Sequence, residues 1–245
     1  KEPYAKRTSH GMILGENGEK MSKSRGNVVN PDEIVDTYGA DTMRLYEMFI
    51  GDFEKAAPWS PKSIKGCRRF LERVWSLAEK VQDGDEYSKE HEALMHRTIK
   101  KVGEDADSLK ANTAIAALMT MLNEFYDKGV NKAEYKTFLA LLNPFAPHIT
   151  EELWEQLGFA AQTHKMCCQA EWPVYDASKT VASSVEMAIQ VNGKMKGTVT
   201  MPVDSDEETI KAAALAVDKV QKATEGMQIV KTILVKNRLI NLIVK

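Results

Sequence analysis

The sequence predicts a mainly α-helical protein of more than one domain, in which a loop-bearing segment precedes a helical bundle and a small α+β domain ends the chain. The length of 245 residues allows more than one domain. Apolar residues recur at helical spacing through most of residues 61–157. After residue 185, apolar and polar residues alternate on both sides of an Asn-Gly pair, the pattern of a β-hairpin.

The composition is that of an ordinary globular protein, with 28% charged and 43% hydrophobic residues and a net charge of −2. No apolar run approaches the roughly 20 residues that cross a bilayer, and the first residues lack the apolar segment of a secretion signal. The three cysteines fit a reducing compartment better than a disulfide framework. We therefore expect a cytoplasmic protein.

The most distinctive stretch is residues 18–27, which read Gly-Glu-Lys-Met-Ser-Lys-Ser-Arg-Gly-Asn. Lys20, Lys23 and Arg25 place three cations within six residues. The flanking glycines permit positive φ angles and large backbone movements, and lysines act as point charges toward a polyanion. The stretch predicts a phosphate-binding loop.

The residues around this loop predict one short strand and two short helices. An apolar run at 11–14 is typical of a strand that enters a turn. Asn30 and Pro31 predict a helix start, and Gly39 predicts its end. Asp41 is expected to cap a second helix that reaches about Ile50.

Residues 61–157 predict the helical bundle. Ser60 and Pro61 begin a helix whose apolar face is expected to include Trp75. Further helices are expected from Ser88, from Asn112, from about Lys132 and from Pro147. Residues 158–184 have an irregular composition and predict a crossing segment and linker.

Four cations lie together on the opposite side of the helix that begins at Pro61: Lys62, Lys65, Arg69 and Arg73. They are three or four positions apart and so share one helix surface. Such a row is either a solvated face or a surface that contacts RNA phosphates, which require long cationic side chains. The spacing alone leaves both interpretations open.

Residues 185–245 predict a ββαββ domain, with hairpins at Asn192-Gly193 and Asn237-Arg238 and a capping box from Ser205 to Glu208. Nine Lys and Arg against seven Asp and Glu make residues 186–245 the basic part of the chain. The candidate RNA contacts of this part are Lys194, Lys196, Lys231, Lys236 and Arg238.

Two other patterns have simpler explanations. His164, Cys167 and Cys168 could form half of a zinc site, but no second ligand pair follows, so no metal is expected. His148 directly follows Pro147 at a predicted helix start, where capping or packing is a more common role than catalysis.

Lys20 to Ser24, Lys-Met-Ser-Lys-Ser, resembles the second signature of class I aminoacyl-tRNA synthetases. Residues 39–46, 143–154 and 191–194 are similar to the bacterial-type leucyl branch of that family. The resemblance covers essentially the whole chain. The first signature of the family, His-Ile-Gly-His, does not occur in the sequence, and the editing domain is also missing.

The resemblance implies three regions: a signature loop and stem-contact segment (1–60), a helical anticodon-binding domain with a linker (61–184), and a small tRNA-contacting domain (185–245). It implies ATP with Mg²⁺ as a ligand of the intact enzyme and tRNA(Leu) as a partner of a monomeric protein. By the same resemblance Lys23 is the principal catalytic residue and Lys20 assists it. The residues expected to contact ATP are Lys20, Met21, Ser22, Lys23 and Ser24.

Two alternatives belong to different classes. A non-catalytic RNA-binding module would need the bundle and the basic tail but not the loop. A valyl or isoleucyl relative would share the loop, but residues 39–42 and the ββαββ tail favour the leucyl branch. Whether the intact enzyme is leucyl, valyl or isoleucyl, a fragment that lacks the first signature is expected to be inactive alone.

Overall fold

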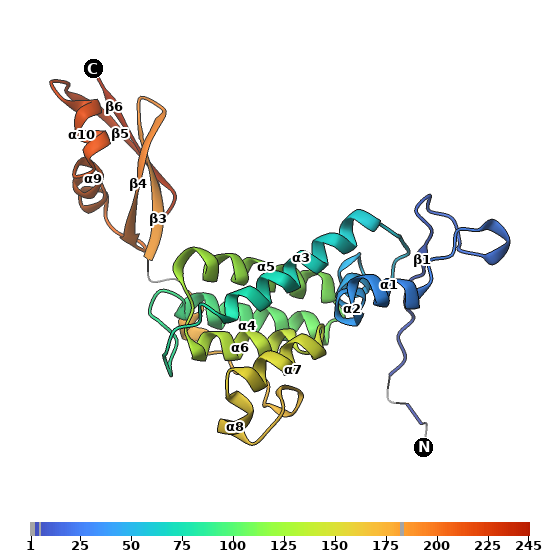
Figure 1. Ribbon diagram of the computed structural model, residues 1–245. Helices are drawn as coiled ribbons and strands as arrows, with labels where there is room; N and C mark the ends of the chain where they lie inside the picture. Colours follow the sequence, from blue (N-terminus) through green and yellow to red (C-terminus); the bar gives the residue numbers. More distant parts are fainter. Residues whose placement is uncertain (1–2, 5, 182–183) are drawn as a thin grey trace. The chain divides into compact units, whose positions relative to one another are not determined.

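The computed structural model of the protein describes residues 3–4, 6–181 and 184–245 (Figure 1). The chain forms two compact units, Lys1–Thr180 and Val181–Lys245. The described helices include none that is long and apolar enough to span a membrane.

The first unit begins with a short two-stranded sheet that frames the loop. Strand β1 (Ile13–Leu14) pairs in parallel with β2 (Ala57–Pro58). Helix α1 (Pro31–Tyr38) has the predicted bounds, because the Asn30 side chain accepts a hydrogen bond from the amide of Asp32 and Pro31 occupies the first helical position. Helix α2 (Ala40–Phe49) follows directly.

The predicted cap of α2 is wrong. Gly39, with a φ of 88°, is the residue that precedes α2, and Asp41 lies inside the helix. The Asp41 carboxylate instead accepts hydrogen bonds from two amides in the first turn of α7 (Pro147–Gln156): His148 N at 3.3 Å and Ile149 N at 2.7 Å. It also accepts one from His148 Nδ1 at 2.8 Å. The residue before α7, Ala146, has no side-chain oxygen, so Asp41 supplies the missing cap from a distant part of the chain.

Five helices form the bundle, and they share one hydrophobic core with Leu45 and Tyr46 of α2 (Figure 1). Besides α7 they are α3 (Pro61–Ala78), α4 (Glu92–Asp107), α5 (Ala111–Lys128) and α6 (Lys132–Leu142). The starts of α3, α6 and α7 agree with the sequence prediction. Helix α4 begins four residues after Ser88. The Ser88 hydroxyl accepts a hydrogen bond from the amide of His91 at 3.3 Å, and its amide and hydroxyl donate to Glu134, so Ser88 caps the turn that leads into the helix.

Trp75 does not belong to the buried face of α3. Its neighbours Leu71 and Val74 are buried, but 41% of the Trp75 surface is exposed. Trp75 lies at the edge of the apolar stripe, where a large side chain leaves the core and borders solvent. The sequence pattern alone assigned it to the core.

Most of the segment predicted as a linker packs against the bundle. It contains α8 (Phe159–Thr163) and two short 3₁₀ turns (Cys167–Gln169 and Ala177–Lys179). Phe159 and Cys167 are buried in the bundle core. The Glu151 carboxylate accepts hydrogen bonds at 2.7 Å from the amides of Cys167 and Cys168. Residues 182 and 183 of the predicted linker lie outside the described residues.

The second unit is a four-stranded sheet with two helices on one face. Its strands are β3 (Ser184–Val191), β4 (Lys194–Pro202), β5 (Ile229–Val235) and β6 (Leu239–Val244), in the order β4-β3-β6-β5. The two hairpins occur where the sequence predicts them, and β3 pairs with β6 in parallel. The single predicted helix is two helices, α9 (Glu207–Leu215) and α10 (Asp218–Thr224), and Asp206 rather than Ser205 caps α9.

A buried carboxylate ties the start of α6 to the chain before α4. Glu134, 1% exposed, accepts hydrogen bonds from the amide and hydroxyl of Ser88 and from the amide of Asn131. His91 Nδ1 lies 3.2 Å from the same carboxylate. Burial acts to raise the pKa of Glu134, but the contact with His91 and the hydrogen bonds from Ser88 and Asn131 outweigh it and lower the pKa to about 2.

Glu134→Gln is expected to lower the free energy of unfolding at pH 7 by about 3 kcal/mol, because a fall in pKa from 4.5 to about 2 reflects stabilisation of the charged form in the folded state. This stabilisation is present above pH 4.5 and is lost as the pH falls toward 2. Urea unfolding at several pH values measures it, with the exposed Glu155→Gln as control. A difference between wild type and Glu134→Gln that stays constant from pH 7 to pH 3 would contradict the assignment.

Asp41→Ala is expected to destabilise the first unit by about 1–2 kcal/mol, because it removes the cap of α7 and leaves two amides without their partner. Asp36→Ala, an exposed change on α1, is the matched control. Chemical denaturation of both variants provides the comparison. Equal stability of the two variants would show that Asp41 does not act as a cap.

Candidate functional site

The loop at residues 18–27 is closed at its base by backbone hydrogen bonds. The amide of Gly15 donates to the carbonyl of Glu19 at 2.8 Å, and the amide of Gly18 donates to the carbonyl of Gly15 at 2.9 Å. Gly18 and Gly26 have φ angles of 74° and 68°, which glycine adopts without steric cost. Figure 1 shows the loop as a projection beyond β1.

Asn27 fixes the shape of the loop. Its side-chain oxygen accepts a hydrogen bond from the amide of Ser22 at 2.9 Å, and its side-chain nitrogen donates to the carbonyl of Lys20 at 3.3 Å. Met21 is half-buried and packs against the bundle core, which anchors the same stretch. The sequence pattern does not predict this role of Asn27, and its one signal is an amide side chain directly after the loop glycine.

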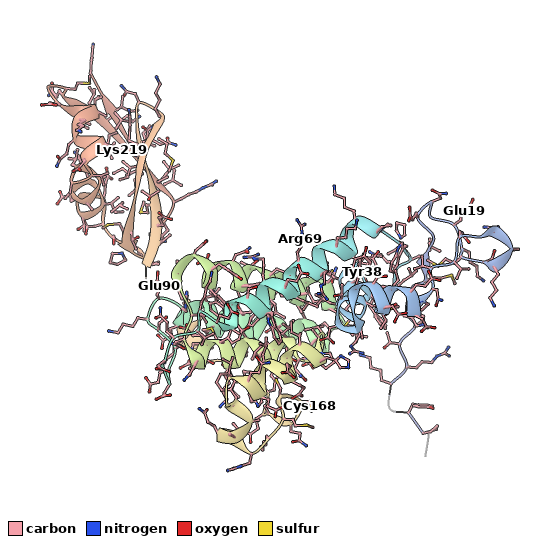
Figure 2. The ribbon with its side chains drawn as sticks, in the orientation of Figure 1. Glu19, Tyr38, Arg69, Glu90, Cys168 and Lys219 are labelled. Carbon is pink, nitrogen blue, oxygen red and sulfur yellow. The ribbon has the colours of Figure 1, made fainter. Side chains whose placement is uncertain are left out.

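The tip of the loop carries free cations and hydroxyls. Lys23 begins a single 3₁₀ turn, Lys23–Arg25, and the hydroxyls of Ser22 and Ser24 lie 3.2 Å apart. Lys20 and Lys23 are exposed and form no ion pair with any residue that the structure describes. Arg25 differs, because it pairs with Glu19, labelled in Figure 2, at 3.3 Å. Two unpaired lysines beside two hydroxyls suit a phosphate-rich ligand.

The cationic row on α3 divides into two parts. Lys62, Lys65 and Arg69 are exposed and have no ion-pair partner within residues 3–4, 6–181 and 184–245. Figure 2 labels Arg69 on the outer side of α3. Arg73 instead donates to Asn123 Oδ1 at 2.8 Å, and its guanidinium lies 4.6 Å above the Tyr126 ring. Three of the four predicted cations are therefore free to meet a ligand.

The cations of the second unit do not form one cluster. Lys194 follows the β3–β4 turn, whereas Lys236 and Arg238 lie at the β5–β6 turn. Because β3 and β6 run parallel, with Ala188 opposite Leu239 and Val191 opposite Leu242, these turns are at opposite ends of the sheet. Lys236 also pairs with Asp204 at 3.1 Å. Lys196 is half-buried in β4, and Lys231 is exposed in β5.

The structure gives the cysteine-containing segment a packing role. Burial, followed by the charge of Glu151, raises the pKa of the Cys167 thiol to about 12. Among the described residues there is no group of three or more His, Cys, Asp or Glu that could hold a metal ion.

Two family models match parts of the chain, and known proteins match the whole of it. Residues 1–60 match the family model of class I tRNA synthetases (I, L, M and V), and residues 89–212 match that of the anticodon-binding domain of tRNA ligase. The whole chain is 55% identical to part of a leucine–tRNA ligase of Alkaliphilus oremlandii (strain OhILAs), of which it covers 30%.

One solved structure is similar over the full chain. It is the agnB2 LeuRS of Agrobacterium radiobacter K84, solved as a ternary complex with tRNA and LeuAMS; the TM-score is 0.67 at 30% identity, and the chain covers 33% of that protein. The chain thus spans about a third of the length of these relatives. The anticodon-binding match alone spans half of the chain. The chain therefore belongs to the class I tRNA ligase family that carries this anticodon-binding domain, and it corresponds to the C-terminal part of a leucine–tRNA ligase.

Proposed function

We propose that the chain is the C-terminal portion of an ATP-dependent leucine–tRNA ligase, in which it supplies the mobile half of the ATP site and positions tRNA(Leu). The observation that carries the proposal is the loop itself. Lys20 and Lys23 are exposed without ion-pair partners in the described part of the chain, on a loop whose shape Asn27 sets. The 55% identity to a leucine–tRNA ligase supports the choice of amino acid.

The chemistry required of the loop is stabilisation of charge. Leucine activation forms a bond between the leucine carboxylate and the α-phosphorus of ATP and breaks the bond to pyrophosphate, on which negative charge accumulates. Lys23 supplies the main positive charge and Lys20 assists it, while Ser22 and Ser24 offer hydroxyl donors. A loop that closes late makes these contacts mainly in the transition state, which raises the rate more than ground-state binding does.

Mg²⁺ is expected to arrive bound to the triphosphate and not to this loop. Residues 20–27 contain no acidic side chain, and the preceding Glu19 is paired with Arg25. Mg²⁺ is usually held by one or two carboxylates together with substrate phosphates. Any protein carboxylates for this ion would therefore come from another part of the intact enzyme.

The remaining regions are proposed to hold tRNA. Residues 1–60 form the loop and stem-contact segment, residues 61–184 the anticodon-binding domain with its linker, and residues 185–245 a tRNA-contacting domain of a monomeric, cytoplasmic enzyme. Lys62, Lys65 and Arg69 are the strongest candidates for phosphate contacts, because they are exposed without ion-pair partners among the described residues and lie along one surface of α3. Since the His-Ile-Gly-His signature does not occur in the 245 residues, we expect the isolated chain to be inactive in leucine activation.

Lys23→Ala in the full-length ligase is expected to slow leucine-dependent ATP–pyrophosphate exchange by about 100-fold or more, because it removes the main positive charge that stabilises the departing pyrophosphate. The dissociation constant for tRNA(Leu) should stay within about twofold, since the cationic row on α3 is unchanged. Lys55→Ala, an exposed lysine of the same segment that pairs with Asp52, is the control. Unchanged exchange in Lys23→Ala would exclude the proposed role.

Deletion of Val181–Lys245 from the full-length ligase is expected to reduce aminoacylation at limiting tRNA(Leu) by about tenfold or more, which corresponds to about 1.4 kcal/mol of lost transition-state stabilisation. ATP–pyrophosphate exchange should be preserved, because the deleted unit has its own core and contains none of the loop residues. Parallel loss of both activities would mean that this unit supports folding of the enzyme and does not serve tRNA alone.

A further inference from the structure

An open hollow of about 600 Å³ lies where the α1–α2 turn, α3 and α7 meet, and none of the loop residues lines it. The side chains that matter for its chemistry are Arg68, Glu72, Trp75 and His148. Asp41, which caps α7, also borders it. The hollow is thus built on the junction between the loop-bearing segment and the bundle.

Trp75 gives the hollow an aromatic wall. The side chain is 41% exposed, although it is a large apolar group on a helix whose buried face is otherwise well covered. An exposed indole ring can stack with a flat aromatic ligand, and stacking on aromatic side chains is a general way to hold unpaired bases.

Asp41 orients the His148 ring, which lines the hollow. The contact between His148 Nδ1 and Asp41 Oδ1 is 2.8 Å long, and a carboxylate can only accept, so the hydrogen of this contact belongs to Nδ1. The other ring nitrogen, Nε2, is left for a ligand, and the His148 side chain is 74% exposed. Asp41 itself is largely buried and held by two amides, which fixes the ring.

Arg68 and Glu72 complete a wall of donors and acceptors with little net charge. Arg68 Nε donates to Glu72 Oε1 at 2.9 Å, and Arg68 Nη1 donates to the carbonyl of Tyr38 at 3.0 Å. The guanidinium keeps further N–H groups, and the carboxylate keeps an oxygen, for a ligand. A neutral pair of this kind suits the edge of a nucleobase better than a phosphate, which would meet the Glu72 charge.

The phosphates of the same ligand have a place on the same helix. Lys62, Lys65 and Arg69 lie on the adjacent surface of α3 and have no ion-pair partner among the described residues. A cationic track beside an aromatic platform is the arrangement that single-stranded RNA requires. Phosphate contacts on the row would fix the backbone, while base contacts in the hollow would read one nucleotide.

We propose that this hollow takes one unpaired base of a bound RNA, stacked on Trp75 with its polar edge toward Arg68, Glu72 and His148. The proposal rests on the proposed function, because it requires that the bundle binds tRNA. It adds a base-binding site to a surface for which only phosphate contacts are otherwise suggested.

The test measures binding of a tRNA(Leu) transcript to the 245-residue chain by filter binding at several salt concentrations. Trp75→Leu, which keeps an apolar side chain but removes the ring, should weaken binding by about tenfold. Trp75→Phe should restore most of the affinity, since a ring face returns. Trp172→Leu is the matched control, because Trp172 is 42% exposed but lies outside the hollow. Circular dichroism verifies that each variant folds.

A second measurement separates base from phosphate contacts. The slope of log Kd against log salt should be unchanged in Trp75→Leu and smaller in Lys65→Ala, because only the lysine releases counterions. Wild-type and Trp75→Leu chains with equal affinity would overturn the proposal, as would Trp75→Phe as weak as Trp75→Leu. A change in sedimentation with unchanged RNA affinity would assign the hollow to contact with a second copy. No tRNA binding by the wild-type chain would overturn the proposed function itself.

Discussion

The carboxylate of Asp41 is the interaction on which the position of the loop-bearing segment depends. It comes from the first turn of α2 and caps α7, more than a hundred residues later. A largely buried carboxylate is stable only when its oxygens are hydrogen-bonded, and the positive end of a helix dipole stabilises it further. Leu45, one helical turn after Asp41, and the adjacent Tyr46 are buried in the bundle core and hold the same helix. The loop is thus attached to the bundle through α1 and α2.

The charged side chains divide into those with partners in the fold and those without. Most buried or half-buried charges have partners: Glu134 with Ser88 and Asn131, Glu151 with the amides after α8, and Asp41 with α7. The lysines of the loop and the first three cations of the α3 row have no such partner in the described parts of the chain. Exposed unpaired cations contribute little to folding stability. Exposed cations without an ion-pair partner among the described residues also occur elsewhere, for example Lys219. The loop lysines are distinguished by the two hydroxyls beside them, and the α3 cations by their row on one helix surface; these two features are the basis of the proposed phosphate contacts.

Local signals predicted much of the fold. Asn30 with Pro31, and Ser60 with Pro61, set the starts of α1 and α3, because a cap and a helical proline act over a few residues. The signal for the turn at Asn192-Gly193 is equally local, because it lies in two adjacent residues. The cap by Asp41, the exposure of Trp75 and the pairing of β3 with β6 depend on residues far apart in the chain, which periodicity does not report.

At the candidate site, the sequence motif pointed to Lys20 and Lys23. The hydrogen bonds of Asn27 could be found only from the folded loop. The positions of Lys194 and Arg238 at opposite ends of the sheet likewise follow from the strand order, which the sequence does not report.

Amide hydrogen exchange at the first turn of α7 tests most directly whether Asp41 joins the loop-bearing segment to the bundle. In the wild-type chain the amides of His148 and Ile149, which donate to Asp41, should exchange slowly. In Asp41→Ala, exchange should become faster at these two amides and along α1 and α2, while α4 and α5 keep their protection. Unchanged exchange at His148 and Ile149, or faster exchange spread evenly over all helices, would contradict this account.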